Sequence, residues 1–294
     1  MHTDIIKTMS ITRWEDAFSH ETALDAVAAL EHGSILHFPS LPFTLLSSET
    51  PFLAPDHVSP KTKNISFHAE RGTLSGALGS PDTLHAIRTM LHRFSDNASR
   101  LVHTLLSPYA AFLQRGRTSF RPIEIKGRPS SVRKDDTRLH VDAFPSQPIQ
   151  GKRILRVFTN INPADQDRVW RVGEPFTEVA KRFLPEVSQP WLFAAPLLKA
   201  LRLTKSRRTE YDHIMLQIHD RMKANDTYQR EVSQREVRFA PGHTWIVQTD
   251  SVSHAAMRGQ HLLEQTFYFP VSAMVNPAAS PLRILEKMCG RYLV

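Results

Sequence analysis

The sequence of 294 residues contains a single cysteine, Cys289. One thiol excludes a disulfide within the chain and any metal site built from clustered thiolates. Long apolar runs are also missing: the longest, 191–198, has eight residues and includes Pro196, whereas roughly 20 are needed to cross a bilayer. Charged side chains interrupt the first 18 residues, so no secretory signal is visible. We therefore expect a soluble, cytoplasmic protein.

Repeats, low-complexity tracts and linker-like segments are absent as well, which favours one domain. Hydrophobic residues make up 41% of the chain and charged residues 22%, so there is material for a packed core and intrinsic disorder is excluded. Lys and Arg number 37 against 29 Asp and Glu, for a net charge of +8. This balance favours an anionic partner: nucleic acid, an acidic membrane surface, or a substrate with carboxylates or phosphates.

Hydrophobic periodicity locates the secondary structure. Apolar residues that recur every three or four positions predict helices over 20–32, 81–105, 174–183, 209–223 and 280–288. Alternating, β-branched or aromatic segments predict strands over 34–43, 120–125, 138–144, 153–160, 235–239, 243–249 and 262–269.

The order of these segments predicts a single α+β domain. We divide it into four parts. A helix-rich part covers 1–116, and two groups of core strands cover 117–170 and 235–270. A helical insertion outside the core covers 174–224, and a C-terminal helix covers 280–294.

Among the 15 histidines, His140 stands out because it is followed by Val141 and Asp142. Residues i and i+2 of a strand point to the same face, so the imidazole and the carboxylate lie side by side. Together they offer two ligands for a divalent metal. The pattern by itself also fits a polar pair at the end of a strand.

A third ligand is available from His254, which follows the strand 243–249 and a short polar turn. A histidine that opens the next strand after such a turn is what a double-stranded β-helix needs to complete its metal site. Two histidines and one carboxylate leave positions open on iron(II) for a cosubstrate and dioxygen.

Arginines are frequent around these strands. Arg156 lies inside an otherwise apolar strand, between Leu155 and Val157, where a charge needs a partner. Because Arg binds carboxylates in a bidentate fork, Arg156 is a candidate to hold a dicarboxylate such as 2-oxoglutarate. Strand parity places it on one face with Ile154 and Phe158, while Arg153 takes the other face; in the opposite register Arg153 would be the anchor.

Several long strings resemble one known family, the Kdo hydroxylases. They are RLHVDAFPSQPIQGKRILRVFTNINP, DRVWRVGEPF, TEYDHIMLQIHDRMK, FAPGHTWIVQTDSVSHAAMRGQ and LEQTFYFP, in this order from about residue 117 onwards. The N-terminal third resembles the family more loosely.

The resemblance implies an Fe(II)- and 2-oxoglutarate-dependent dioxygenase with a double-stranded β-helix core and flanking helices. It places the metal ligands on His140, Asp142 and His254. It places the cosubstrate pocket on Arg121, Arg156, Arg168 and Trp170, with Arg156 as our first choice for the anchor. We further assign sugar-acid contacts to Arg138, Arg153 and Arg171, although local Asp or Glu residues are alternative partners for Arg153 and Arg171.

By the same resemblance, the reaction uses dioxygen and 2-oxoglutarate to hydroxylate C3 of Kdo (3-deoxy-D-manno-oct-2-ulosonic acid) in Kdo-lipid A, giving Ko. A basic protein without a membrane span would dock peripherally on the inner face of the inner membrane. The sequence sets no oligomeric state.

Three other functions are compatible with parts of the sequence. The fold could serve a 2-oxoglutarate oxygenase that acts on a protein or a small metabolite. The metal triad could hold zinc for hydrolysis. The charge could serve a nucleic-acid-binding module, although no recognition motif is visible and we expect no nucleic acid partner.

Overall fold

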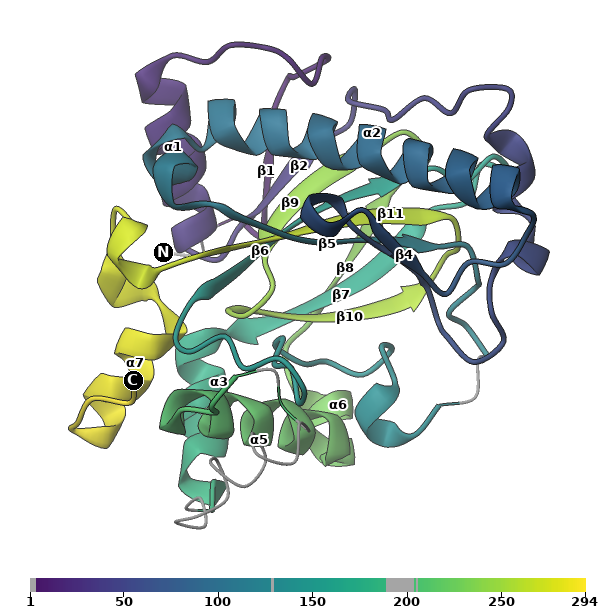
Figure 1. The fold of residues 1–294 in the computed structure, drawn as a ribbon. Coiled ribbons are helices and arrows are strands. Elements are labelled where there is room, and N and C mark those ends of the chain that lie inside the picture. Colours follow the sequence, from purple (N-terminus) through teal and green to yellow (C-terminus); the bar gives the residue numbers. More distant parts are fainter. Residues whose placement is uncertain (1–3, 128–129, 189–203, 205) are drawn as a thin grey trace.

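The computed structural model describes residues 4–127, 130–188, 204 and 206–294. These residues form two β-sheets, with helices packed on the outer side of each (Figure 1). None of the helices in this part of the chain is both long and apolar enough to cross a bilayer.

The helices and strands have the following bounds. The helices are α1 (His20–Glu31), α2 (Pro81–Leu105), α3 (Phe176–Phe183), α5 (Glu210–Ala224), α6 (Asp226–Glu231) and α7 (Pro281–Cys289). The strands are β1 (Ile6–Thr8), β2 (Ile35–Phe38), β3 (Ile65–His68), β4 (Thr73–Ser75), β5 (Gln114–Arg121), β6 (Arg153–Asn160), β7 (Arg168–Pro175), β8 (Arg235–Phe239), β9 (Thr244–Gln248), β10 (Val252–Arg258) and β11 (Leu262–Phe269).

The large sheet has eight strands in the order β1-β2-β9-β6-β11-β5-β3-β4, and the small sheet has three in the order β10-β7-β8. Strands β1 and β2 pair in parallel, and every other strand pair in the described residues is antiparallel. Strands β9 and β10 follow each other in sequence but belong to different sheets, so the chain crosses from one sheet to the other just before His254.

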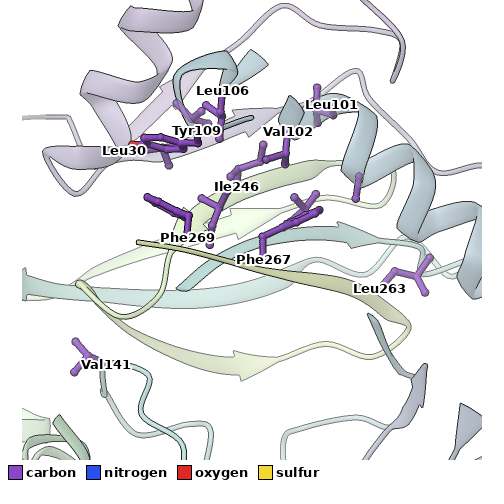
Figure 2. Packing of buried hydrophobic residues seen from close by; sticks show 14 of the residues in the cluster. Leu30, Leu101, Val102, Leu106, Tyr109, Val141, Ile246, Leu263, Phe267 and Phe269 are labelled. Atoms are coloured by element: carbon purple, nitrogen blue, oxygen red, sulfur yellow. The ribbon is translucent and has the colours of Figure 1, made fainter. Parts of the chain in front are cut away.

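The outer face of the large sheet packs on α1 and α2. Helix α2 begins at Pro81, after the Ser80 side chain accepts a hydrogen bond from the Thr83 amide, and its apolar stripe faces the sheet. In Figure 2, Leu101 and Val102 of α2 lie above Ile246, Phe267 and other apolar residues of the sheet. This packing buries the main hydrophobic core.

A second, aromatic cluster fills part of the space between the sheets. Phe158 and Trp245 come from the large sheet, and Trp170 and Phe239 come from the small one. The rings of Phe239 and Trp245 stack with centroids 3.9 Å apart, and Trp170 meets Trp245 edge-on at 5.7 Å. The cluster therefore joins the two inner faces.

Strand β6 is buried over its whole length because both of its faces are covered. Leu155 and Val157 join the core under the helices, and Phe158 joins the aromatic cluster. Arg156 has the parity of Phe158 and pairs with Asp142 between the sheets, which confirms the predicted register. Arg153 points to the other face.

Arg153 takes part in a fully buried ion pair. Its Nε lies 2.6 Å from Oδ2 of Asp250, and its Nη2 donates to both Gln248 and Ser251. Burial raises the pKa of Asp250, and the Arg153 guanidinium lowers it by a smaller amount, so the pKa is raised overall. The pair ties the start of β6 to the turn between β9 and β10.

Most predicted elements are present, with some differences in position. The helical spacing of 174–183 and 209–223 is confirmed by α3 and α5, whereas 189–203 and 205, also in the predicted insertion, lie outside the described residues. The predicted strand 120–125 is wrong in position, because β5 ends at Arg121 and Pro122 follows. Strands β1, β3, β4 and β7 were not predicted, whereas β2 lies within the predicted strand 34–43.

We predict that Arg153→Leu lowers the free energy of unfolding by about 3–5 kcal/mol, because it leaves the Asp250 carboxylate buried without its partner. Equilibrium unfolding in urea measures this change, and Arg235→Leu, at an exposed position on β8, is the control. The double variant Arg153→Leu/Asp250→Leu should recover part of the loss. Unchanged stability of the single variant would contradict a structural role for this pair.

Candidate metal centre and active site

His140, Asp142 and His254 converge in the space between the sheets. All three are buried, and one potential ligand atom from each lies within 4.8 Å of the others. His254 belongs to β10. The segment 138–144 was predicted as a strand, but His140 forms only an isolated antiparallel bridge with His254. The two amide–carbonyl hydrogen bonds of this bridge measure 3.0 and 2.9 Å, and they set the two rings next to each other.

Both imidazoles are oriented by their own backbone. Nδ1 of His140 lies 2.8 Å from the carbonyl oxygen of Arg138, and Nδ1 of His254 lies 2.8 Å from that of Val252. A carbonyl only accepts hydrogen bonds, so each Nδ1 carries the proton and donates it. Each Nε2 is thereby left with a lone pair, which is the state that a metal ligand requires.

The protonation states of the triad suit a cation. Burial, and then the charge of His254, lower the pKa of His140 well below its usual value, and burial also lowers the pKa of His254. Burial opposes ionisation of Asp142, but the Arg156 guanidinium, the two neighbouring histidines His254 and His219 and a hydrogen bond from Thr249 together outweigh burial, so the pKa of this carboxyl lies below its usual range. The site therefore combines two neutral imidazoles with one carboxylate.

Neighbouring rings fix the positions of the two histidines. Trp170 stacks on His254 with centroids 5.0 Å apart. His219 of α5 meets His140 edge-on at 5.3 Å. Trp170, predicted from the sequence to belong to the cosubstrate pocket, thus lies directly against a proposed metal ligand.

Arg156 connects the triad to a second buried carboxylate. Its guanidinium lies 3.0 Å from Asp142 and 3.2 Å from Glu264 of β11. Arg121, another predicted pocket residue, also pairs with Glu264. Burial opposes the ionisation of Glu264, but Arg121 and Arg156 together lower its pKa. Two of the predicted arginines therefore meet on one carboxylate beside the proposed metal site.

Arg168 has a different environment. It is 2% exposed, and it donates from Nη1 to the carbonyl of Gly259 at 2.8 Å. Its Nε has no hydrogen-bond partner, and it forms no ion pair with the described residues. Burial, and then the nearby charge of Arg121, lower the pKa of Arg168 to about 9. A buried guanidinium in this state is suited to receive an anion.

The three arginines assigned to the sugar acid lie elsewhere. Arg138 pairs with Asp226, and Arg171 donates to the sulfur of Met257 and the carbonyl of Thr137. Arg153 is held by Asp250, as described above. Their role in substrate binding stays a prediction, and their present partners favour structural roles.

Other charged residues near the triad were not predicted. Glu264 lies in the strand LLEQTFYF, and the reasoning that singled out Arg156 in an apolar strand could have identified it as the partner. Lys223 of α5 is 2% exposed, with its Nζ 4.0 Å from Asp136. The charges of Arg121, Lys63 and Lys223 outweigh burial and hold the pKa of Asp136 at about 2. No local pattern marks these two residues, because they come together only through the docking of α5.

Comparison with known proteins identifies the family. The profile of the 3-deoxy-D-manno-oct-2-ulosonic acid (Kdo) hydroxylase family matches residues 13–292. The chain belongs to the Kdo hydroxylase family.

Solved structures of a Kdo hydroxylase agree with this assignment. The chain is 45% identical to KdoO, described as a non-heme Fe(II) alphaketoglutarate dependent dioxygenase. The comparison with its cobalt(II) complex covers 99% of this chain and 98% of that one, with a TM-score of 0.97. For the complex with alphaketoglutarate and Fe(III), coverage is 98% and 97%, with a TM-score of 0.95. No match was found among curated proteins.

We predict that replacing any one of His140, Asp142 or His254 by Ala weakens Co(II) binding at least about 100-fold, because each change removes one of the three proposed ligands. Calorimetry and the visible spectrum of bound Co(II) report the change. His103→Ala is the control, since His103 is an exposed histidine whose Nδ1 also meets a backbone carbonyl. Wild-type affinity in all three variants would rule out the triad as the metal site.

Proposed function

We propose that this Kdo hydroxylase binds Fe(II) through His140, Asp142 and His254 and uses 2-oxoglutarate and dioxygen to hydroxylate C3 of Kdo. The observation that carries the proposal is the convergence of two correctly oriented imidazoles and one carboxylate within 4.8 Å. The printed descriptions of the similar KdoO structures, which include iron with alphaketoglutarate and iron with succinate, support it.

The residues of the site fit a metal. The three ligand atoms are two imidazole nitrogens and one carboxylate oxygen, which is the ligand set of non-haem iron(II) oxygenases. A bound iron(II), together with 2-oxoglutarate and dioxygen, supplies the conversion of a C–H bond to C–OH, while 2-oxoglutarate becomes succinate and carbon dioxide.

The protein's contribution is to orient these groups and to exclude water. Arg156 holds the Asp142 carboxylate ionised and in place. Trp170 and His219 pack against the two imidazoles, so the ligands cannot rotate freely. Because all three ligands are buried, the charges act in a medium of low dielectric constant.

The cosubstrate pocket comprises Arg121, Arg156, Arg168 and Trp170 in this proposal. Within it, the geometry favours Arg168 for the distal carboxylate of 2-oxoglutarate, because Arg156 already pairs with Asp142 and Glu264 whereas Arg168 forms no ion pair with the described residues. Arg121 lies close enough to lower the pKa of Arg168, so an anion there would gain from both charges.

The proposed substrate is Kdo-lipid A, bound from the membrane surface. The net charge of +8 supports attraction to an acidic headgroup and an anionic leaflet, and we place the protein peripherally on the inner face of the inner membrane. We further propose that the two facing sheets, with the triad between them, form a double-stranded β-helix.

We predict that the purified protein, given Fe(II), ascorbate and 2-oxoglutarate, forms succinate and adds about 16 Da to Kdo-lipid A, the mass of one oxygen atom. Mass spectrometry of the sugar and succinate analysis measure both products, and the His140→Ala variant should form neither. Succinate formation without oxygen on Kdo would favour an oxygenase of another substrate. Hydrolysis with zinc and no succinate would overturn the proposal.

We predict that Arg168→Ala weakens the binding of 2-oxoglutarate to the Co(II)-loaded protein about 100-fold, since a charged contact is lost, while Co(II) affinity is unchanged. Arg171→Ala is the control, because Arg171 lies on the same strand with the opposite parity. If Arg156→Ala weakens the binding of 2-oxoglutarate and Arg168→Ala does not, the anchor is Arg156, as the sequence predicts.

A further inference from the structure

A cavity of about 470 Å³ adjoins the proposed metal centre. Arg156 lines it and also pairs with Asp142, 3.0 Å away. Phe144, two residues after Asp142, lines it as well. The cavity and the triad therefore share a wall, and a molecule in the cavity would approach the reacting centre from that side.

The cavity has the size and lining of a small-molecule site. Its volume falls within the roughly 300–1,000 Å³ of such sites, and the aromatic rings of Phe144 and Tyr268 form part of the wall. Tyr268 lies tightly over Gly116: a Cβ added there would come within 2.8 Å of Cε2 of the tyrosine and 2.9 Å of the Thr266 carbonyl oxygen. Because Gly116 has no side chain, the Tyr268 ring can pack directly against β5.

Arginine dominates the charge of the cavity. Its wall includes Arg71, Arg115, Arg117 and Arg156. Arg115 pairs with Asp96 at 2.7 Å, and Arg156 is paired as described. The guanidinium groups of Arg71 and Arg117 are therefore the candidates to bind an anionic group of a ligand.

Arg71 and Arg117 are both exposed, and neither forms an ion pair with the residues that the structure describes. Arg117 lies on β5, near Tyr268 of the neighbouring β11. Burial raises the pKa of Tyr268, and the charges of Arg156 and Arg117 oppose that rise. Arg117 therefore acts on the same part of the cavity wall as Arg156, without a carboxylate of its own.

We propose that this cavity receives the acidic sugar and that Arg117, assisted by Arg71, binds an anionic group of the substrate. This inference rests on the proposed function and adds the residues that select the substrate. A planar guanidinium binds either a carboxylate or a phosphate in a bidentate manner, so the shared chemistry is an oxyanion: the sugar carboxylate or a lipid A phosphate. Arg138, Arg153 and Arg171 do not line this cavity.

The test measures binding rather than turnover. The protein is loaded with Co(II) and 2-oxoglutarate and titrated by calorimetry with two probes: the deacylated saccharide of Kdo-lipid A with its phosphates, and the same saccharide after phosphatase treatment. We expect Arg117→Ala to weaken saccharide binding about 10- to 100-fold, the range for one hydrogen-bonded charge. Arg71→Ala should act in the same direction.

The two probes identify the anion. If Arg117→Ala binds both probes more weakly than wild type, Arg117 contacts the sugar carboxylate. If it binds only the phosphorylated probe more weakly, Arg117 contacts a phosphate. The affinity for 2-oxoglutarate and the thermal unfolding temperature should be unchanged, and Arg117→Lys should restore part of the affinity. Arg235→Ala, another exposed arginine on a strand, is the control.

Failure of the inference is distinct from failure of the proposed function. If the wild-type protein binds the saccharide and hydroxylates Kdo-lipid A, but Arg117→Ala binds both probes as tightly as wild type, the cavity assignment is overturned and the function stands. If the wild-type protein binds neither probe and forms no hydroxylated product, the proposed function itself fails, and the assignment fails with it.

Discussion

One pair of backbone hydrogen bonds holds the proposed active site together. His140 and His254 are far apart in the sequence, and they meet because each donates its amide to the carbonyl of the other, at 3.0 and 2.9 Å. An antiparallel bridge of this kind brings opposite side chains close together. The two imidazoles and the carboxylate of Asp142 therefore depend on strand β10 lying in register with a segment that is otherwise irregular.

The chemistry around that bridge is a balance of buried charges. Arg156 lies between Asp142 and Glu264, and Arg121 approaches Glu264 from a neighbouring strand. Each of these charges would be costly alone. Together they keep both carboxylates ionised in a space that is partly filled by aromatic rings, so the site stays charged although it is buried.

The sequence predicts the parts of this site that depend on local pattern. The two-residue spacing of His140 and Asp142 places them on one face, and strand parity places Arg156 and Arg153 on opposite faces, with Arg156 as the first choice for the inner one. His254 required the order of strand, turn and strand, supported by resemblance to the Kdo hydroxylases. Strand β7, which carries Arg168 and Trp170, was not predicted, because its alternation of apolar and polar residues is short and is interrupted by charged residues.

What the sequence could not predict are contacts made by docking. The ion pair of Arg153 with Asp250 and the placing of Lys223 beside Asp136 depend on how separate elements pack. Charge and spacing alone do not say which arginine meets which carboxylate. This is why the arginines assigned to the sugar acid are found with protein partners, while Arg117, which no local signal marks, lines the cavity.

Helix α5 connects the stability of the fold to the occupancy of the centre. It supplies His219, which packs against His140, and Lys223, which lies near Asp136. Any ion that binds the triad adds its binding free energy to the arrangement in which α5 is docked. Metal occupancy should then slow amide hydrogen exchange along α5 more than along α2, which packs on the far face of the large sheet. Local opening of α5, measured by this exchange, would then report whether a metal occupies the centre.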